Sequence, residues 1–536
     1  MGWGDGERNG TPVSGSARDL ARAGMVVTSA LFVSRILGWV RVAVIAASLG
    51  IGRELDVYTA AFRIPDFLFQ LVAAGALASA VIPTIAALVR SGEQERAWRV
   101  VSTIANLLML VLAALAIVTF VAAPALAPLI APGFGPAATE QLVELTRILL
   151  LSPIFLALSA VATSILNSAG RFAASVMAPI VYNLSIIAAA IFLVPQFGLA
   201  GLAWGTVAGA VATLAVQVLP VVRQVGFHYT PRVDLRDAEA RRTLVLLGPR
   251  AIGMAGGQLT LLMLTILGST LVPGAIGAFG LAFTIFQIPL GTIAYPLGIV
   301  ALPALSTRVA GGEIDEYVGL VTRALRLLGF AMLPIACIAA GVALQVVDLV
   351  VDFGEVDDAG IALTGAAFLG LLAALPSEAM IIVLSRAFFA ARNTWIPVGA
   401  ALASVLVAVV TATLLVGPLG IFGLALGVTV ASWVEAVLLL GAFRYRHAGF
   451  GLLRLGRAHL WYLAAAAVAG LVADRAYDLA AGALPADPGA LATLVVLAAV
   501  GALGLLVYVA LAALLRVPEL PATVRLVRTG LGRGTA

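Results

Sequence analysis

The amino-acid sequence predicts an all-α polytopic membrane protein with about 14 transmembrane helices. Of its 536 residues, 62% are hydrophobic and 11% are charged, and the mean hydropathy is +1.09. Apolar runs of about 20 residues, the length that crosses a bilayer as a helix, recur from one end of the chain to the other. A membrane β-barrel is not expected, because its strands would appear as short segments of alternating polarity.

The expected spans follow one another with short polar connections. Residues 1–24 are polar, so a disordered tail without a cleavable signal peptide is expected before the first span. Glycine and proline within the spans are compatible with membrane helices. The spans are predicted near residues 25–49, 58–89, 98–130, 138–168, 173–194, 199–223, 241–272, 277–308, 316–348, 360–391, 397–416, 420–443, 459–475 and 489–515.

The placement of arginines predicts the orientation. If the N-terminus is cytoplasmic, most arginines of the connections lie inside, whereas the outside turns hold only Arg53, Arg147 and Arg475. The outside turns carry the acidic clusters instead, within residues 348–358 and 474–487. This asymmetry follows the positive-inside rule and agrees with an even number of spans. We therefore expect a multi-pass protein of the cytoplasmic (inner) membrane with both termini in the cytoplasm.

The sequence repeats itself at an offset of 222 residues: FGLAGLAWG at 197–205 returns as LGIFGLALG at 419–427. The spaced glycines predict close helix packing. Two six-helix halves in the same order form a parallel repeat, and transporters of this kind bind substrate between the halves. The predicted domains are a cytoplasmic tail (1–24), an N-lobe (25–223, helices 1–6), a cytoplasmic linker (224–240), a C-lobe (241–445, helices 7–12), helices 13–14 (446–516) and a second cytoplasmic tail (517–536).

Three arginines, Arg35, Arg41 and Arg63, fall within the first two predicted spans. An arginine at a helix centre in lipid costs about 2.5–3.5 kcal/mol on insertion scales, so such residues usually face a bundle interior or a cavity. Guanidinium groups bind oxyanions through two parallel hydrogen bonds, which favours a phosphate-binding site. The alternatives are a buried acid as partner of Arg41, snorkelling of Arg35, and a local pair of Arg63 with Asp66.

On a straight helix, Arg35 and Arg41 point about 120° apart, so a kink near Gly38 would be needed to bring them to one cavity. Asp56, in the turn after the first span, is a candidate gate residue or a turn residue. The intramembrane acids Glu378 and Glu435 are candidate ion-coupling residues.

The alternative for these two acids is solvation or pairing with arginine, for which Arg386 and Arg392 are near Glu378 in sequence. Spans 241–272, 277–308 and 397–416 contain no acidic residue. Carboxylate-held sodium in the second half is therefore not expected, and protons or the membrane potential are the expected driving force.

The composition argues against several function classes. The single cysteine, Cys337, permits no disulfide within the chain, and the three histidines, expected in polar connections, form no metal-binding motif. No P-loop or hydrolase motif is present, so neither a cofactor nor enzymatic activity is expected. The net charge of +5 lies in short loops between spans, which does not favour a nucleic-acid partner.

The opening of the chain resembles the MurJ (MviN) family of lipid II flippases, part of the multidrug/oligosaccharidyl-lipid/polysaccharide exporter superfamily. The residues that carry the resemblance are SRILGWVR at 34–41, Asp56, AFRIP at 61–65, Gly75-Ala76, VIP at 81–83, LNS at 166–168 and RFA at 171–173. The resemblance implies alternating access, a cationic cavity for the undecaprenyl-diphosphate precursor lipid II, and a groove for its tail near the last two helices.

By position, the resemblance makes Arg35, Arg41 and Arg63 substrate-binding residues. The chain departs from the family at Phe69, where a further arginine is usual, at Ala74, where glutamate is usual, and at Phe283 and Thr284, where an Asp-Arg pair is usual. Two other functions remain open: a flippase for another polyprenyl-linked glycan or a drug exporter of the same fold, and a non-transporting cell-wall scaffold. Expected partners are the lipid-linked glycan, membrane lipids and cell-wall synthesis proteins.

Overall fold

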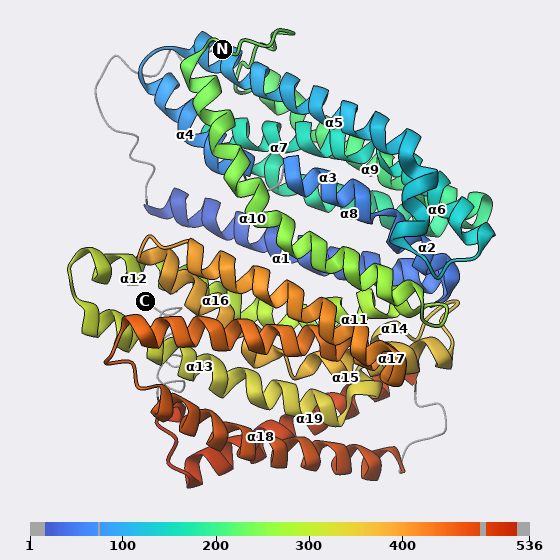
Figure 1. Ribbon diagram of the computed structural model, residues 1–536, viewed down its shortest axis with the longest axis vertical. Helices are drawn as coiled ribbons and strands as arrows, with labels where there is room; N and C mark the ends of the chain where they lie inside the picture. The colour runs from blue at the N-terminus through green and yellow to red at the C-terminus, as the bar shows by residue number, and fades with distance from the viewer. Residues whose placement is uncertain (1–16, 73–75, 483–488, 522–536) are drawn as a thin grey trace. The chain divides into compact units, whose positions relative to one another are not determined.

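A computed structural model describes residues 17–72, 76–482 and 489–521, with only the backbone described for helical residues 17–32, 71–72, 76–80 and 244–256. The described residues form nineteen α-helices and one π-helical turn, and none of them lies in a strand (Figure 1). The prediction of an all-α fold is therefore confirmed.

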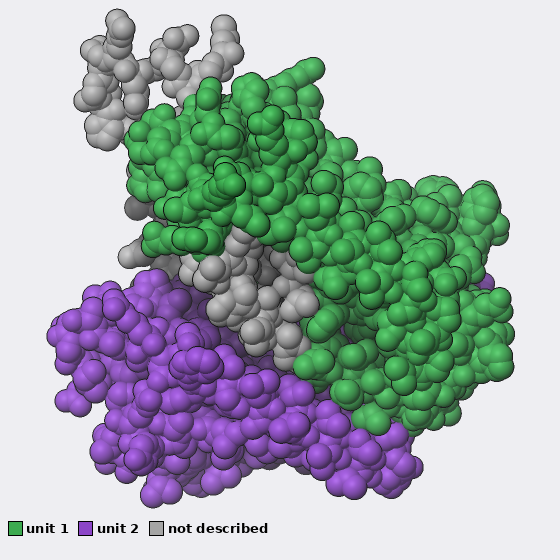
Figure 2. All heavy atoms as spheres, turned by 45° about the horizontal axis from the view of Figure 1, so that its top comes forward, with its two compact units in different colours: residues 1–277 green, residues 278–536 purple. Residues whose placement is uncertain are grey.

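The chain divides into two compact units, residues 1–277 and residues 278–536 (Figure 2). Helix α11 (Ala275–Pro289) begins in the first unit and continues in the second. The other described helices of the first unit are α1 (Ala17–Leu49), α2 (Arg53–Ala61), α3 (Arg63–Val72), α4 (Ala76–Arg90), α5 (Gln94–Ile130), α6 (Pro136–Leu149), α7 (Ser152–Ser168), α8 (Phe172–Phe192), α9 (Val194–Arg223) and α10 (Ala238–Ser269).

The second unit continues from α11 through a π-helical turn, η1 (Leu290–Ala294). Its further described helices are α12 (Tyr295–Ala310), α13 (Ile314–Gly341), α14 (Ala343–Val351), α15 (Asp358–Leu372), α16 (Leu375–Ala390), α17 (Trp395–Arg446), α18 (Leu452–Ala481) and α19 (Gly489–Leu514).

Among the described residues, nine helical stretches are long and apolar enough to cross a membrane, and α15 with α16, bent by 48°, form a tenth. Several stretches are longer than one span needs; α17, with 52 residues, covers two predicted spans. Each predicted span coincides with a helix or with a run of broken helices. A polytopic membrane protein is confirmed, and the count of 14 remains a prediction.

Proline explains breaks within spans that were predicted to be continuous. Within the predicted span 58–89, α2 ends at Ala61 and α3 begins at Arg63, and Pro65 stands in the first turn of α3. Pro153 and Pro376 likewise stand at the starts of α7 and α16. Proline has no N–H and clashes with the carbonyl four residues earlier, so a helix readily breaks before it. These helices therefore end and restart inside the membrane region.

The glycine repeat is visible in the backbone of both units. Gly198 within α9 and Gly420 within α17 have the same φ of 56°, with ψ of −143° and −134°. This conformation strains residues that carry a Cβ, so glycine is required where the chain turns between two helices. Close packing of the neighbouring glycines is also confirmed: a Cβ on Gly205 would lie 2.0 Å from the Ala189 Cβ, and one on Gly427 2.7 Å from the Ala412 Cβ.

Helix α10, which the repeat assigns to the second half, packs against α3, α4 and α5 of the first unit. The Thr84 and Thr243 hydroxyls lie 3.1 Å apart across the α4–α10 contact. At the other end of α10, the Gly133 N–H donates to the Ser269 Oγ at 3.2 Å. Contacts along its length therefore fix α10 to the first unit.

The polar segment 224–237 between α9 and α10, which we call the linker strap, lies along α5. Asn106 donates from its Nδ2 to the carbonyls of Thr230 and Arg232, each at 2.9 Å. The hydroxyls of Ser102 and Thr103 accept from the backbone N–H groups of Thr230 and Asp234. Additional contacts are a hydrogen bond from the Tyr229 hydroxyl to the Asn106 Oδ1 and an edge-on ring contact between Phe227 and Trp98.

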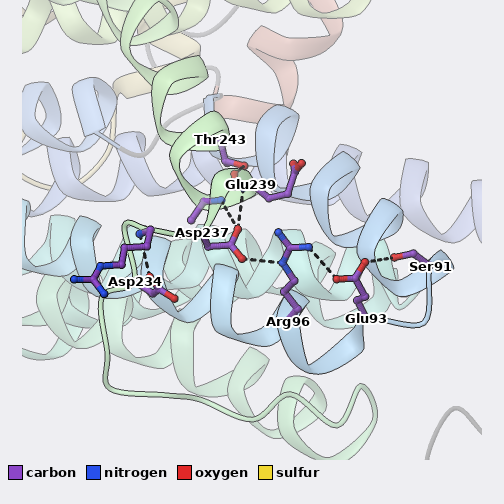
Figure 3. Close-up of polar contacts among 9 residues, drawn as sticks. Ser91, Glu93, Arg96, Asp234, Asp237, Glu239 and Thr243 are labelled. Carbon is purple, nitrogen blue, oxygen red and sulfur yellow. Dashed lines mark hydrogen bonds and ion pairs between the residues drawn. The ribbon is translucent and has the colours of Figure 1, made fainter.

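A charged cluster holds the strap where α10 begins (Figure 3). The Asp237 Oδ1 caps α10 by accepting from the Glu239 and Ala240 N–H groups, while its Oδ2 accepts from the Arg96 Nε at 2.8 Å. Arg96 also bonds Glu93 at 2.9 Å. Hydrogen bonding to the Arg96 guanidinium lowers the pKa of both acids. Asp237 thus joins the α4–α5 turn to the start of α10.

In the second unit, α18 and α19 pack beside α13, within the part of the chain that Figure 1 colours yellow to red. The Arg326 Nε lies 2.6 Å from the Glu519 Oε1, and the Tyr462 hydroxyl donates to the other Glu519 oxygen at 2.5 Å. His459 was expected in a polar connection. That expectation is wrong, because His459 lies within α18. Its ring faces Gly329, and a Cβ added at Gly329 would lie 2.1 Å from the His459 Nε2.

Candidate functional site

Arg41 lies in the second half of α1 and is partly buried. Its charge acts on three groups of the first unit: the Asp66 carboxyl of α3, the Tyr58 hydroxyl of α2 and the Tyr182 hydroxyl of α8. A charge within a membrane helix is tolerated where other helices supply polar partners. Arg41 therefore faces the interior of the first unit rather than lipid.

Arg35 is exposed and lies closer to the N-terminal end of the same helix. Helix α1 runs without a break through Gly38, so the kink that would align the two arginines is absent from this part of the helix. Six residues on a straight helix separate the two side chains by about 120°. The structure thus brings Arg41 into the polar cluster and gives Arg35 a different direction.

Arg63 is held by a partner from a distant part of the chain. Its Nε donates to the Thr265 Oγ1 of α10 at 2.7 Å, and its charge acts on Asp66. Asp66 in turn bonds the Gln70 side chain and also experiences the charge of Arg41. One carboxylate is therefore shared by two arginines, which leaves an excess of positive charge among these residues.

Hydroxyl groups complete the cluster. The Tyr58 hydroxyl lies 3.1 Å from the Thr206 Oγ1 of α9, and Thr206 is fully buried. Tyr182 faces the same arginine as Tyr58. We call the set Arg41, Tyr58, Arg63, Asp66, Tyr182 and Thr265 the arginine cluster. It gathers α1, α2, α3, α8 and α10, and it presents guanidinium and hydroxyl donors that suit an oxyanion.

Asp56 is completely buried at the start of α2. Its Oδ2 accepts from the Gly274 N–H at 2.7 Å and its Oδ1 from the Gly277 N–H at 2.9 Å. A carboxylate at a helix N-terminus satisfies backbone donors and interacts favourably with the helix dipole. Asp56 therefore fixes the turn that precedes α11 to the first helical hairpin.

The departures from the family pattern are filled by apolar packing. Phe69 packs against a buried cluster that contains Leu112 and Leu150. Phe283 stacks on Phe279 and Phe286, with ring centroids 6.1 and 5.9 Å away. The Thr284 hydroxyl is directed to the Gly280 carbonyl within its own helix, at 2.8 Å, and Ala74 lies outside the described residues.

The two intramembrane acids of the second unit come together between α16 and α17. Glu378 hydrogen-bonds the Ser432 side chain and experiences the charge of Glu435. Glu435 accepts from the Ser404 hydroxyl at 2.7 Å. The expected pairing of Glu378 with Arg386 or Arg392 is not found among the described residues, because the charged group that acts on Glu378 is Glu435.

Several residues of both sites were not anticipated from the sequence. Tyr58 and Tyr182 read as ordinary apolar-span residues, and Thr265 lies 202 positions from the arginine that it accepts from. Ser404 and Ser432 contact the two glutamates from α17, and they too carry no motif. The only signal in the sequence for these residues is a hydroxyl group expected at the same depth in the membrane as a charged side chain.

A membrane bundle with a repeated backbone, partly buried arginines in one unit and a pair of acids in the other has the architecture of a secondary transporter. Known structures share the fold. Lipid II flippase MurJ in an inward closed conformation matches with a TM-score of 0.75 and 20% identity over 92% of this chain and 98% of that chain. An inward-facing multidrug resistance MATE family transporter matches with a TM-score of 0.62 and 18% identity over 79% and 95%.

The family model for lipid II flippase MurJ matches residues 45–480, so the chain belongs to the MurJ family. A probable lipid II flippase MurJ of Rhizobium meliloti is 31% identical over 77% of this chain and 78% of that protein. The lipid II flippase MurJ of Burkholderia cenocepacia is 27% identical over 80% of this chain and 84% of that protein. The resemblance found in the sequence is thereby confirmed.

The Asp56 contact predicts a specific loss of stability. Asp56→Asn keeps the size of the side chain but leaves it with one acceptor oxygen for two N–H groups. The buried N–H that loses its partner should cost about 1–3 kcal/mol. We expect a lower thermal unfolding midpoint for the detergent-purified protein.

Glu54→Gln is the matched control, because Glu54 lies on the same helix and is exposed. That variant should unfold at the parent's temperature. Equal midpoints for Asp56→Asn and the parent would show that the two N–H contacts do not contribute to stability.

Proposed function

We propose that this chain moves lipid II, the undecaprenyl-diphosphate-linked peptidoglycan precursor, across the cytoplasmic membrane by alternating access. The observation that supports it most directly is the arginine cluster in a chain of the MurJ family. A diphosphate is the part of lipid II that guanidinium groups recognise, through charged and bidentate hydrogen bonds. The proposed role is transport without chemical change of the substrate.

Within this proposal, Arg41 is the principal contact for the diphosphate. It is partly buried, and the one acid on which its charge acts among the described residues, Asp66, also experiences the charge of Arg63, so a single carboxylate faces two positive charges. Arg63, with its Nε directed to Thr265, supports the cluster and adds charge. Arg35, exposed and turned away from Arg41, is proposed to meet substrate earlier on its path.

Three alternatives are less well supported. A drug exporter of the same fold would agree with the MATE structures, but the family model and the curated relatives are those of MurJ. A cell-wall scaffold without transport, or a flippase for a different polyprenyl-linked glycan, would fit the apolar packing at Phe69 and Phe283. Membrane lipids and cell-wall synthesis proteins are proposed partners under each of these functions.

The proposed location is the inner membrane, with both ends of the chain and the linker strap in the cytoplasm. The strap contains Arg232 and Arg236 and is anchored by Arg96, whereas Arg475 stands with Asp474 and Asp478 at the opposite end of α18 from Arg454 and Arg457. This distribution is the one that the positive-inside rule favours.

Reporter fusions test the orientation. Fusions after Gly226 and after His447 should give cytoplasmic signals, and a fusion after Asp357 should give an external one, because arginine-rich connections stay inside. Reporter activity in whole cells, normalised to expression, is the measurement. A reversed pattern would contradict the proposed orientation.

We also propose that Glu378 and Glu435 couple transport to protons. Glu378 and Glu435 are partly buried. Two carboxylates that act on each other away from bulk water favour sharing a proton, which relieves the repulsion between like charges. Serine hydroxyls bond each of them, and Ser377 links to Ser432 at 2.8 Å. In the same scheme the Asp56 contacts to Gly274 and Gly277 are the bonds that a gate would break.

Proton coupling predicts a change in driving force. Glu378→Gln cannot lose a proton, so vesicle transport driven by a proton gradient should fall to a small fraction of the parent rate and lose its dependence on pH. Glu355→Gln, an exposed acid in the turn before α15, is the matched control and should behave as the parent. Unchanged proton dependence in Glu378→Gln, or sodium-driven transport without membrane potential, would contradict the proposal.

Substitution of Arg41 tests the substrate site. Loss of one charged hydrogen bond to a diphosphate in a water-poor site should cost about 1.5–3 kcal/mol. This corresponds to roughly ten- to hundredfold weaker binding. Arg41→Ala should insert normally but fail to complement a strain without its own flippase. Arg41→Lys should complement in part, because it keeps the charge but not the planar fork.

Thr284→Arg tests the same site with the opposite expected result, a gain in complementation. It restores a cation where the family pattern has one, so it should improve complementation if charge limits substrate binding. Membrane levels of each variant serve as the control. Full complementation by Arg41→Ala would overturn the diphosphate site and favour the scaffold function.

A further inference from the structure

An apolar groove opens on the first unit between α5, α6, α7 and α9, and none of its lining residues belongs to the arginine cluster. Its volume is about 400 Å³, and its walls include Ala113 and Ile117 of α5, Leu151 and Ile154 near the α6–α7 break, and Trp204 of α9. Pockets of about 300–1,000 Å³ accommodate small molecules. Among the lining residues, all of which are described, Arg147 is the only charged one.

The position of Arg147 follows from a proline. Pro124 within α5 has no N–H to give to the carbonyl of Phe120, four residues earlier. The Arg147 Nε supplies the missing hydrogen bond at 3.1 Å from the Phe120 oxygen, and its guanidinium lies 4.7 Å from the centroid of the Phe120 ring. A freed carbonyl in a membrane helix requires such a partner. Arg147 is therefore held at the groove by its Nε.

In this arrangement the hydrogen bond to Phe120 uses only the Nε of Arg147 and not its two terminal nitrogens. A guanidinium has five N–H donors, and the Phe120 carbonyl accepts one of them. Among the described residues Arg147 takes part in no ion pair, although Glu144 lies one turn away on α6. The groove thus combines an apolar trough with a positive charge that lacks a carboxylate.

The surroundings indicate what fills the groove. Ile117 is 65% exposed, Phe120 48%, Leu151 40% and Trp204 52%. In a membrane-spanning helical unit, apolar side chains exposed in this way contact lipid, and tryptophan favours the border between hydrocarbon and headgroups. An occupant that is apolar along its length and anionic at one end is complementary to both parts of the groove.

We propose that this groove binds a phospholipid, with one acyl chain along α5, α6 and α9 and the headgroup phosphate on Arg147. The phosphate accepts from the terminal guanidinium nitrogens, and Trp204 flanks the chain. The site shares no residue with the arginine cluster and does not depend on the transported substrate. It would couple the local lipid composition to the α5–α6 contact.

Native mass spectrometry of the purified full-length protein tests this inference with dioleoyl-phosphatidylglycerol as the probe. The parent should retain one lipid more tightly than the others. Arg147→Gln should weaken that binding by roughly tenfold, the effect of losing one charged hydrogen bond, whereas Arg147→Lys should retain most of it. Dioleoylglycerol, which has the same chains and no phosphate, should bind the parent as weakly as the phospholipid binds Arg147→Gln.

Two further variants separate the site from general effects. Ala113→Phe narrows the groove without changing the bond between Arg147 and Phe120, so it should also weaken phospholipid binding even if Arg147→Gln misfolds. Arg475→Gln removes an exposed arginine elsewhere and should bind as the parent does. Retention of the lipid by both Arg147→Gln and Ala113→Phe, equal binding of dioleoylglycerol by the parent, or an equal loss in Arg475→Gln would overturn the proposal.

Discussion

Hydrocarbon offers no hydrogen-bond partner, so every charge and every freed backbone group inside the membrane region must be satisfied by the protein itself. The first unit meets this constraint in two places. Asp56 accepts two N–H groups at the start of α11, and Arg147 donates to the carbonyl that Pro124 leaves without a partner. Asp66 likewise experiences the charges of two arginines, Arg41 and Arg63. The charged residues that hold the helices in place are thus also those available for binding.

Fold class and repeat could be predicted from the sequence because both are carried by long, local patterns. Span-length apolar runs predicted the helices, and paired glycine motifs predicted a repeat with close helix packing. The repeat is seen in the backbone at Gly198 and Gly420, which have the same φ of 56°. The breaks inside spans were harder to place, since proline is tolerated within some membrane helices and ends others. Pro179 lies inside α8, whereas Pro153 stands at the start of α7.

The sites could be predicted only in part, because their geometry depends on contacts across the chain. Arg41 and Arg63 were identifiable as charges within apolar spans, but Thr265, which accepts from Arg63, is 202 positions away. Sequence proximity suggested arginine partners for Glu378, whereas packing of α16 on α17 provides Ser432 and Glu435. The segment that forms the linker strap was predicted only as a polar linker between the two halves, and its contacts with α5 were not predicted: Asn106, Ser102 and Thr103 bind its backbone.

The central claim is that the arginine cluster serves the transfer of a diphosphate-linked lipid across the membrane. The most direct test uses cells in which this chain is the only flippase, treated with a lipid II-cleaving enzyme that cannot cross the cytoplasmic membrane. The account predicts that the precursor becomes accessible and is cleaved as soon as the chain is expressed. Precursor that stays intact in such cells, while the chain is present in the membrane at normal levels, would contradict it.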